Sequence, residues 1–241
     1  GLRINICDYV TKVDYLINIP VLKGHCQTNV TCALKNMKGC IPDSEKRKFH
    51  TMGLHEPIAY LNKLIKQSLI IVDGMNGDLN FEEGGNPVQM NRIIAGKDPV
   101  LIDAYAAQLM GFSIEEVPYI AMAEGIGVGT ADLANADVIE LNKDKGSRRL
   151  TPSRKVQQLS RHIVEDSACS ACYGSLIYAL ERLYEKGLLN KLKEKLYIGQ
   201  NFKNKQYDGV GIGTCTSGFD KCVKGCPPKA RDIVEYLEGL I

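Results

Sequence analysis

The sequence lacks several features that would assign a protein to a class at once. No apolar run is long enough to cross a bilayer, and residues 1–6 are not followed by the apolar segment and cleavage site of a signal peptide. A net charge of +2 gives no electrostatic reason to expect nucleic acid or an anionic membrane as a partner. Tryptophan is absent, which excludes nothing, and there is no internal repeat or low-complexity segment. We therefore expect no membrane span and no nucleic-acid partner.

Cysteine, in contrast, is abundant. The chain has 241 residues and 9 cysteines, an odd number that cannot pair completely in internal disulfides. With 44% hydrophobic residues the chain can build a sizeable core, so a disulfide scaffold is unnecessary. Clustered cysteines without secretory features are typical of metal ligands or redox groups in a reducing compartment. We therefore expect a cytoplasmic protein.

Strand-like and helix-like patterns alternate along the first part of the chain. Apolar, β-branched runs predict strands at residues 14–23, 68–74, 91–96 and 136–141. Helical patterns occur at residues 57–65, 100–110 and 114–124. Asp98-Pro99 is a typical N-cap and first-turn pair for the second of these helices. The alternation predicts the α/β class, with a mainly parallel sheet and helices on both faces.

The charged turn Lys143-Asp-Lys-Gly-Ser-Arg-Arg149 is the expected domain boundary. Residues 1–145 would form the larger α/β domain, and residues 146–241 a smaller cysteine-rich α/β region that could pack with it as one unit. In the second region, patterns predict helices at residues 153–165, 173–186 and 229–240, and strands at residues 195–200 and 209–214.

Cysteines gather in three motifs of the second region. These are Cys169-Ser-Ala-Cys172, Gly213-Thr-Cys215 and Lys221-Cys222-Val-Lys-Gly-Cys226-Pro-Pro228. Two of them lie at predicted helix starts, where the positive end of the helix dipole favours an anionic thiolate site. The glycines before Cys215 let the backbone approach a bulky inorganic group closely. This spacing is what a soft metal ion or an iron–sulfur cluster requires.

Three interpretations of these motifs remain in competition. A four-cysteine zinc site usually pairs one CxxC with a second CxxC, which is missing here. A radical-type C-x3-C-x2-C run is also missing, because no cysteine follows Cys226. Free thiols or a disulfide would leave the clustering unexplained. The motifs favour an iron–sulfur cluster, with zinc as the alternative.

The order Cys-x-x-Cys, Gly-Thr-Cys and Gly-Cys-Pro-Pro resembles the cluster-binding pattern of nickel–iron hydrogenase small subunits. Its last element is similar to that of the quinone-oxidoreductase subunit of respiratory complex I. The resemblance implies a 4Fe–4S cluster held by Cys169, Cys172, Cys215 and Cys226. Cys222 has no counterpart in the pattern and is either a spare thiol or a substitute for Cys215. The hydrogenase large subunit with its nickel ligands is absent, so hydrogenase activity is not implied.

A second group of polar residues lies in the first region. Cationic and hydrogen-bonding side chains there suit a carboxylate or phosphate ligand. The aspartates lie near the carboxyl ends of predicted strands, where ligand crevices form in open α/β sheets. The candidate ligand-binding residues are Lys23, His25, Lys35, Asn36, His50, Asp73 and Asp103. The same set could hold a metal ion or serve in acid–base chemistry, and it could equally stabilise loops.

Three stretches of the first region also carry a resemblance. Pro20-Val-Leu-Lys-Gly-His25, Ile71-Val-Asp-Gly74 and Gly96-Lys-Asp-Pro99 resemble domain-of-unknown-function family 362 in order and spacing, over about residues 14–130. Members of that family often carry iron–sulfur motifs, so the resemblance implies a cluster nearby but no particular activity. It begins close to the first residue, which is not Met, so we expect that the chain is a fragment or that Gly1 is not native.

The sequence therefore predicts an iron–sulfur protein with a redox or electron-transfer role, acting with a small anionic substrate or a partner redox protein. One alternative is a non-redox binding module with structural zinc. Another is an enzyme whose chemistry lies in the His/Lys/Asp loop beside a structural cluster. Whether the chain is an oxidoreductase stays open. Cys26, Cys32 and Cys40 fit no metal spacing and are predicted to be free buried thiols, and the role of Cys7 is open.

Overall fold

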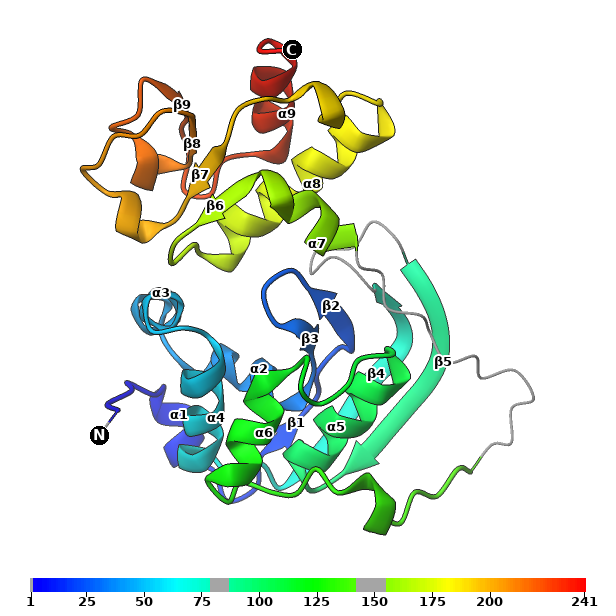
Figure 1. Cartoon of the computed structure of the whole chain (residues 1–241). Helices are drawn as coiled ribbons and strands as arrows, with labels where there is room; N and C mark the ends of the chain where they lie inside the picture. The colour runs from blue at the N-terminus through cyan, green and yellow to red at the C-terminus, as the bar shows by residue number, and fades with distance from the viewer. Residues whose placement is uncertain (1, 79–86, 142–154) are drawn as a thin grey trace. The chain divides into compact units, whose positions relative to one another are not determined.

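A computed structural model of the chain describes residues 2–78, 87–141 and 155–241 (Figure 1). The chain divides into two compact units, unit 1 (Gly1–Ser153) and unit 2 (Arg154–Ile241). Each unit has its own sheet and its own buried core. The charged turn at residues 143–149 that marked the expected boundary lies outside the described residues, as do residues 79–86.

Unit 1 is built around a small mixed sheet. Its elements are α1 (Asp8–Thr11), β1 (Ile17–Asn18), β2 (Lys23–His25), β3 (Asn29–Thr31), α2 (Ala33–Asn36), η1 (Met37–Cys40), α3 (Asp43–Thr51), α4 (His55–Leu64), β4 (Leu69–Asp78), β5 (Pro87–Gly96), α5 (Pro99–Leu109), α6 (Pro118–Gly125) and η2 (Leu133–Asn135), where η marks a 3-10 helix. Strand β1 is parallel to β4, and β5 is antiparallel to β4. Strands β2 and β3 form a separate hairpin.

The sheet of unit 1 has a covered and an uncovered face. Helices α2, α4, α5 and α6 gather on one side of it (Figure 1), where Ile70 and Val72 of β4 are fully buried. Ile17 and Ile93, which point to the other face, are 51% and 69% exposed. Because β5 returns as a hairpin, no crossover helix is needed, and an antiparallel pair can leave one face to water. Within the described part of unit 1, helices thus cover one face of the sheet rather than both.

Helix α5 begins where local chemistry predicts. The Asp98 carboxylate accepts hydrogen bonds from the backbone N–H groups of Val100 (2.8 Å) and Leu101 (3.1 Å), and Pro99 occupies the first helical position. Such a cap satisfies donors that have no partner within the helix. The predicted cap and helix are confirmed, and the helix packs on the unit's core through Val100, Ala104 and their neighbours.

The predicted strand at residues 136–141 is wrong. These residues form no strand, and Ile139 and Leu141 are 79% and 91% exposed. An apolar, β-branched run becomes a strand only where a neighbouring strand supplies hydrogen bonds and a core accepts its side chains. This segment has neither among the described residues.

Unit 2 is built around a parallel sheet. Its elements are α7 (Lys155–Leu159), η3 (Ser160–His162), β6 (Ile163–Glu165), α8 (Ser170–Glu185), η4 (Leu189–Lys191), β7 (Leu196–Ile198), η5 (Gln200–Phe202), β8 (Val210–Ile212), η6 (Thr214–Thr216), β9 (Lys221–Val223) and α9 (Ala230–Glu238). The strands pair in the order β6-β7-β8-β9, and every pair is parallel. The predicted α/β class is confirmed, whereas the helix predicted over residues 153–165 gives way to β6 at its end.

Apolar side chains of the strands and of the two longest helices form the core of unit 2. Those larger than alanine with at most 1% exposure are Leu176, Ile177, Leu180, Leu183, Leu196, Ile198, Val210, Ile212, Ile233 and Leu237. Burying one such side chain contributes roughly 1.5–3 kcal/mol. Helices α8 and α9 pack against each other, and this core holds the strand ends in place. In the described ranges, none of the helices combines the length and apolar composition needed to cross a bilayer.

Candidate functional site

Four cysteines of unit 2 follow strands of its parallel sheet at one edge. Cys169 and Cys172 follow β6, Cys215 follows β8, and Cys226 follows β9. Because these strands are parallel, the residues after them leave the sheet at the same edge, which is where α/β sheets form ligand sites. The topology therefore brings cysteines that are far apart in the sequence to one edge from three separate loops.

The four thiols influence one another electrostatically. Burial, and after it the negative charges of the Cys169, Cys226 and Cys215 thiolates, raises the pKa of the Cys172 thiol to about 12. Cys222 is not among the groups that act on Cys172. Cys226 is exposed, and the other three are half-buried. Four sulfur donors so placed suit a soft cationic centre, which would stabilise the thiolates that otherwise repel one another.

The described residues contain no group arranged as a site for a single metal ion. A single Zn²⁺ with bonds of about 2.3 Å to sulfur holds its thiolates only about 3.8 Å apart. Across the parts of the chain that the structure describes, no group of three or more His, Cys, Asp or Glu side chains could hold a metal ion. This applies equally to the His and Asp candidates of unit 1.

Backbone hydrogen bonds tie the Cys215 loop to the Cys226 loop. The N–H of Gly213 donates to the carbonyl of Val223 (2.7 Å), and the N–H of Thr214 donates to that of Gly225 (2.8 Å). Gly225 has a φ of +144°, and a Cβ there would lie 2.4 Å from the Cα of Pro228. Only glycine fits at this position, because other residues rarely adopt this φ and the contact is with backbone.

The loop before Cys169 is held by the segment that follows strand β7. The side-chain amide of Asn201 donates to Asp166 (2.8 Å), and the N–H of Gln200 donates to the carbonyl of Ser167 (3.2 Å). Gly199 packs so closely that a Cβ would overlap the carbonyl oxygen of Asp166. The sequence did not identify these supporting residues, although Gly199, inside the strand predicted at residues 195–200, was a usable signal.

Helix α8 begins earlier than predicted and includes one of the cysteines. Cys169 is its N-cap residue, and its carbonyl accepts the N–H of Tyr173 (2.9 Å). Cys172 therefore lies in the first turn rather than before the helix. The partial positive charge of a helix N-terminus favours an anionic group at this position.

Cys222 has different surroundings from the other four cysteines. It lies within β9, opposite Gly211 of β8, and not in an edge loop. Its sulfur is 3.6 Å from the hydroxyl oxygen of Thr216 and 3.7 Å from the carbonyl oxygen of Gly213. These contacts hold the Cys215 loop against the sheet.

Among the candidates in unit 1, Asp103 supports the start of a helix. It is fully buried, and its two oxygens accept the backbone N–H groups of Ala33 (2.7 Å) and Leu34 (3.2 Å), the first residues of α2. Burial raises the pKa of Asp103 to about 7, against the opposing effect of hydrogen bonds from these amides and from Cys32 and Tyr119. The carboxyl group thus serves as a cap supplied from a distant helix.

Other candidates also bond to nearby protein groups. The Nδ1 atom of His25 accepts the N–H groups of Gln27 (3.1 Å) and Thr28 (3.2 Å) inside the β2–β3 turn. Buried Lys35 donates to the Thr31 hydroxyl at 3.0 Å. The amide of Asn36 donates to Asn18 at 2.7 Å. Together with Lys23 of β2, these candidates come from one hairpin and the helix that follows it.

The remaining candidates lie on other elements. His50 is half-buried in α3, and Asp73 is exposed on β4. The Asp73 carboxylate accepts the N–H of Met75 at 3.0 Å, and its carbonyl accepts the N–H of Leu22 at 2.8 Å. His50 and Asp73 thus come from other elements than the hairpin and helix that carry Lys23, His25, Lys35 and Asn36.

Comparison with known proteins concerns mainly the first part of the chain. Residues 2–108 match a family described as a domain of unknown function (DUF362), which supports the N-terminal part of the expected resemblance. A thylakoid-associated protein from a Synechocystis species is 28% identical over 122 residues, which are 48% of this chain and 38% of the relative. The chain thus spans well under half of that relative's length. No solved structure matches. The cysteine loops of unit 2 lie outside the family match.

Proposed function

We propose that unit 2 holds a 4Fe–4S cluster on Cys169, Cys172, Cys215 and Cys226 and functions in electron transfer. The main support is the arrival of these four thiols at one edge of a parallel sheet, where three of them act electrostatically on Cys172. A four-iron cluster is larger than one ion, so its ligands lie further apart than those of zinc.

The residues around the thiols would orient the ligands and tune the bound group. Hydrogen bonds between the Gly213 and Gly225 loops and from Asn201 to Asp166 hold the cysteine loops before anything binds. The N-terminus of α8 lowers the free energy of negative charge at Cys172. Burial, solvent exposure and hydrogen bonds to sulfur set the potential of such a group, which when bound accepts and releases single electrons.

Exposure of the site defines the class of partner. Cys226 is exposed and the other three thiols are half-buried, so a bound group would lie close to the surface of unit 2. Electrons would then pass directly to a partner redox protein or to a small anionic substrate. We place the protein in the cytoplasm because its ligand thiols must stay reduced to bind iron.

The test is metal and spectral analysis of the full chain purified without oxygen. We expect stoichiometric iron and sulfide and a broad visible absorption that dithionite bleaches. Serine at Cys169, Cys172, Cys215 or Cys226 should abolish the absorption. Cys222→Ser is the matched control, because that sulfur contacts Thr216 and Gly213 within the same unit, and it should retain the absorption.

Two outcomes would contradict the proposal. Zinc without iron in anaerobic protein would favour the non-redox module with a structural ion. Loss of the absorption in Cys222→Ser, with retention in Cys215→Ser, would show that the ligand set is wrong. Far-ultraviolet circular dichroism of each variant separates loss of the bound group from loss of the fold.

A further inference from the structure

Two cysteines of unit 1, which the proposed cluster site does not use, lie next to each other. The backbone N–H of Cys7 donates to the carbonyl oxygen of Cys40 at 2.8 Å. The Cα of Cys7 is one bond from its N atom, and the Cα of Cys40 is two bonds from its carbonyl oxygen. Adding these covalent distances to the N···O contact places the two Cα atoms at most about 6.7 Å apart. Disulfides usually join residues whose Cα atoms are about 4.4–6.8 Å apart. The two backbones are therefore close enough for a disulfide.

The side chains of this pair support the same inference. Both residues are free, half-buried thiols, so a small oxidant can reach them. Burial, and then the charge of the Cys7 thiolate, raises the pKa of Cys40. The two sulfur groups therefore lie within each other's electrostatic field.

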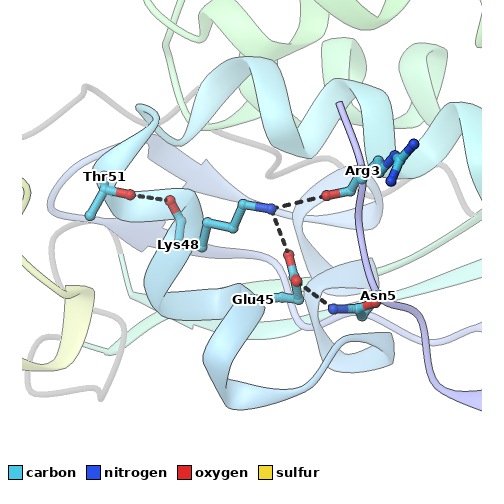
Figure 2. Close-up of polar contacts among 5 residues, drawn as sticks. All are labelled: Arg3, Asn5, Glu45, Lys48 and Thr51. Atoms are coloured by element: carbon cyan, nitrogen blue, oxygen red, sulfur yellow. Dashed lines mark hydrogen bonds and ion pairs between the residues drawn. The ribbon is translucent and has the colours of Figure 1, made fainter. Parts of the chain in front are cut away.

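The N-terminal segment is fixed in register on α3, as Figure 2 shows. Lys48 donates to the carbonyl oxygen of Arg3 at 3.0 Å, and Asn5 donates to the carboxylate of Glu45 at 2.8 Å. Lys48 also lies 3.7 Å from the other oxygen of Glu45. Ile4 and Ile6, which alternate with these anchors, pack against the core. Cys7 is the next residue of this alternating segment, and it lies beside Cys40.

We propose that Cys7 and Cys40 are a reversible dithiol–disulfide pair that locks residues 2–7 onto the start of α3. One thiolate attacks a low-molecular-weight disulfide, forming a mixed disulfide and releasing one small thiol. The second protein thiolate then attacks the protein sulfur of the mixed disulfide and releases the other small thiol. Two protein thiols lose their protons and two electrons, and the small disulfide is reduced to two thiols. Disulfides of reducing compartments are usually transient ones of this kind.

The test uses the full chain in buffers with increasing ratios of glutathione disulfide to glutathione. Free thiols are blocked with N-ethylmaleimide, and the digested protein is analysed by mass spectrometry. We expect one peptide pair linked through Cys7 and Cys40, lost again on adding dithiothreitol. Closing this loop should raise the thermal unfolding midpoint of the oxidised protein by roughly 5–15 °C.

Serine variants separate this pair from the other cysteines. Cys7→Ser and Cys40→Ser should each remove the linked peptides and the thermal shift. Cys26→Ser, at another half-buried cysteine of unit 1, should retain both. Full alkylation of Cys7 and Cys40 at the most oxidising ratio would overturn the proposal, as would linkage of either residue to a different cysteine. Peptide mapping of the unchanged chain gives this result even if a variant fails to fold.

Discussion

Cys32 of unit 1 and the edge cysteines of unit 2 have different surroundings, although the residue type is the same. In unit 1, Cys32 is fully buried, and burial followed by the charge of Asp103 raises its pKa well above the ordinary value. In unit 2, parallel strands deliver Cys169, Cys172 and Cys226 to one edge at partial exposure. A thiol buried away from solvent is inert. Accessible thiols whose negative charges act on one another can instead bind a cation. Topology, more than cysteine count, therefore separates the two kinds of site.

Polar residues show the same contrast. In unit 1, Asp103 accepts backbone N–H groups at the start of α2, and His25 accepts those of its own turn. In unit 2, hydrogen bonds such as that from Thr214 to Gly225 connect loops that each carry a cysteine. These polar groups of unit 1 thus stabilise backbone, and those of unit 2 position side chains of another type. The following predictions test this distinction.

The largest effect should follow a change in the Cys226 loop. Gly225→Ala would place a Cβ 2.4 Å from the Cα of Pro228 at a φ of +144°, so the loop must move. We expect loss of bound iron and of visible absorption in anaerobic protein. Gly174→Ala is the control, because a Cβ meets nothing within 4 Å inside α8. It should retain iron and stabilise the helix by about 0.5–1 kcal/mol. Full iron in Gly225→Ala would show that the site does not depend on this loop.

A large effect on stability, without loss of iron, should follow removal of the buried cap in unit 1. Asp103→Ala leaves the buried N–H groups of Ala33 and Leu34 without their acceptor, which should cost about 3–5 kcal/mol. Asp73→Ala, at an exposed residue with one hydrogen bond to Met75, should cost less than about 1 kcal/mol. Hydrogen exchange resolved by peptide measures the effect in unit 1 separately. Equal costs for the two variants would contradict the assigned role of Asp103.

A somewhat smaller effect should appear as a pH dependence of unit 1. The pKa of Asp103 is about 7 in the folded chain against an ordinary value of 3.8, because burial disfavours the charge. The folded state therefore binds the proton more tightly, and this stabilisation is present below pH 3.8 and is lost as the pH rises through about 7. The full contribution is roughly 4 kcal/mol, of which about 2–3 kcal/mol falls between pH 5 and pH 8.

Urea unfolding at about pH 5 and about pH 8 measures this dependence. The unchanged chain should be less stable at the higher pH. Asp103→Asn cannot ionise, so the difference should shrink in that variant. A difference of the same size in Asp103→Asn would assign the pH dependence to other groups.

The parts of the fold that depend on local chemistry could be predicted. The Asp98 cap, the helix after Pro99 and the β7 strand follow from residues near one another in the sequence. The antiparallel return of β5 onto β4 could not, because strand pairing depends on long-range contacts. A three-residue strand such as β6 also carries too little periodicity to be separated from a helix.

The candidate site shows the same limit. The motifs indicated which cysteines are candidate ligands. They did not show that Cys222 would lie opposite Gly211 inside a strand. Nor could they show that Asp103, near a predicted strand end, would bond to α2 across 70 residues of chain. Side-chain roles of this kind depend on which segments become neighbours, and only the folded arrangement determines that.

The position of β9 has a consequence for how the protein is made. It is the last strand of its sheet, and Cys226 follows it shortly before the final helix, α9. A ribosome must therefore synthesise the chain past β9 before all four edge cysteines can assemble. A chain that stops before β9 would carry the CxxC pair without Cys226.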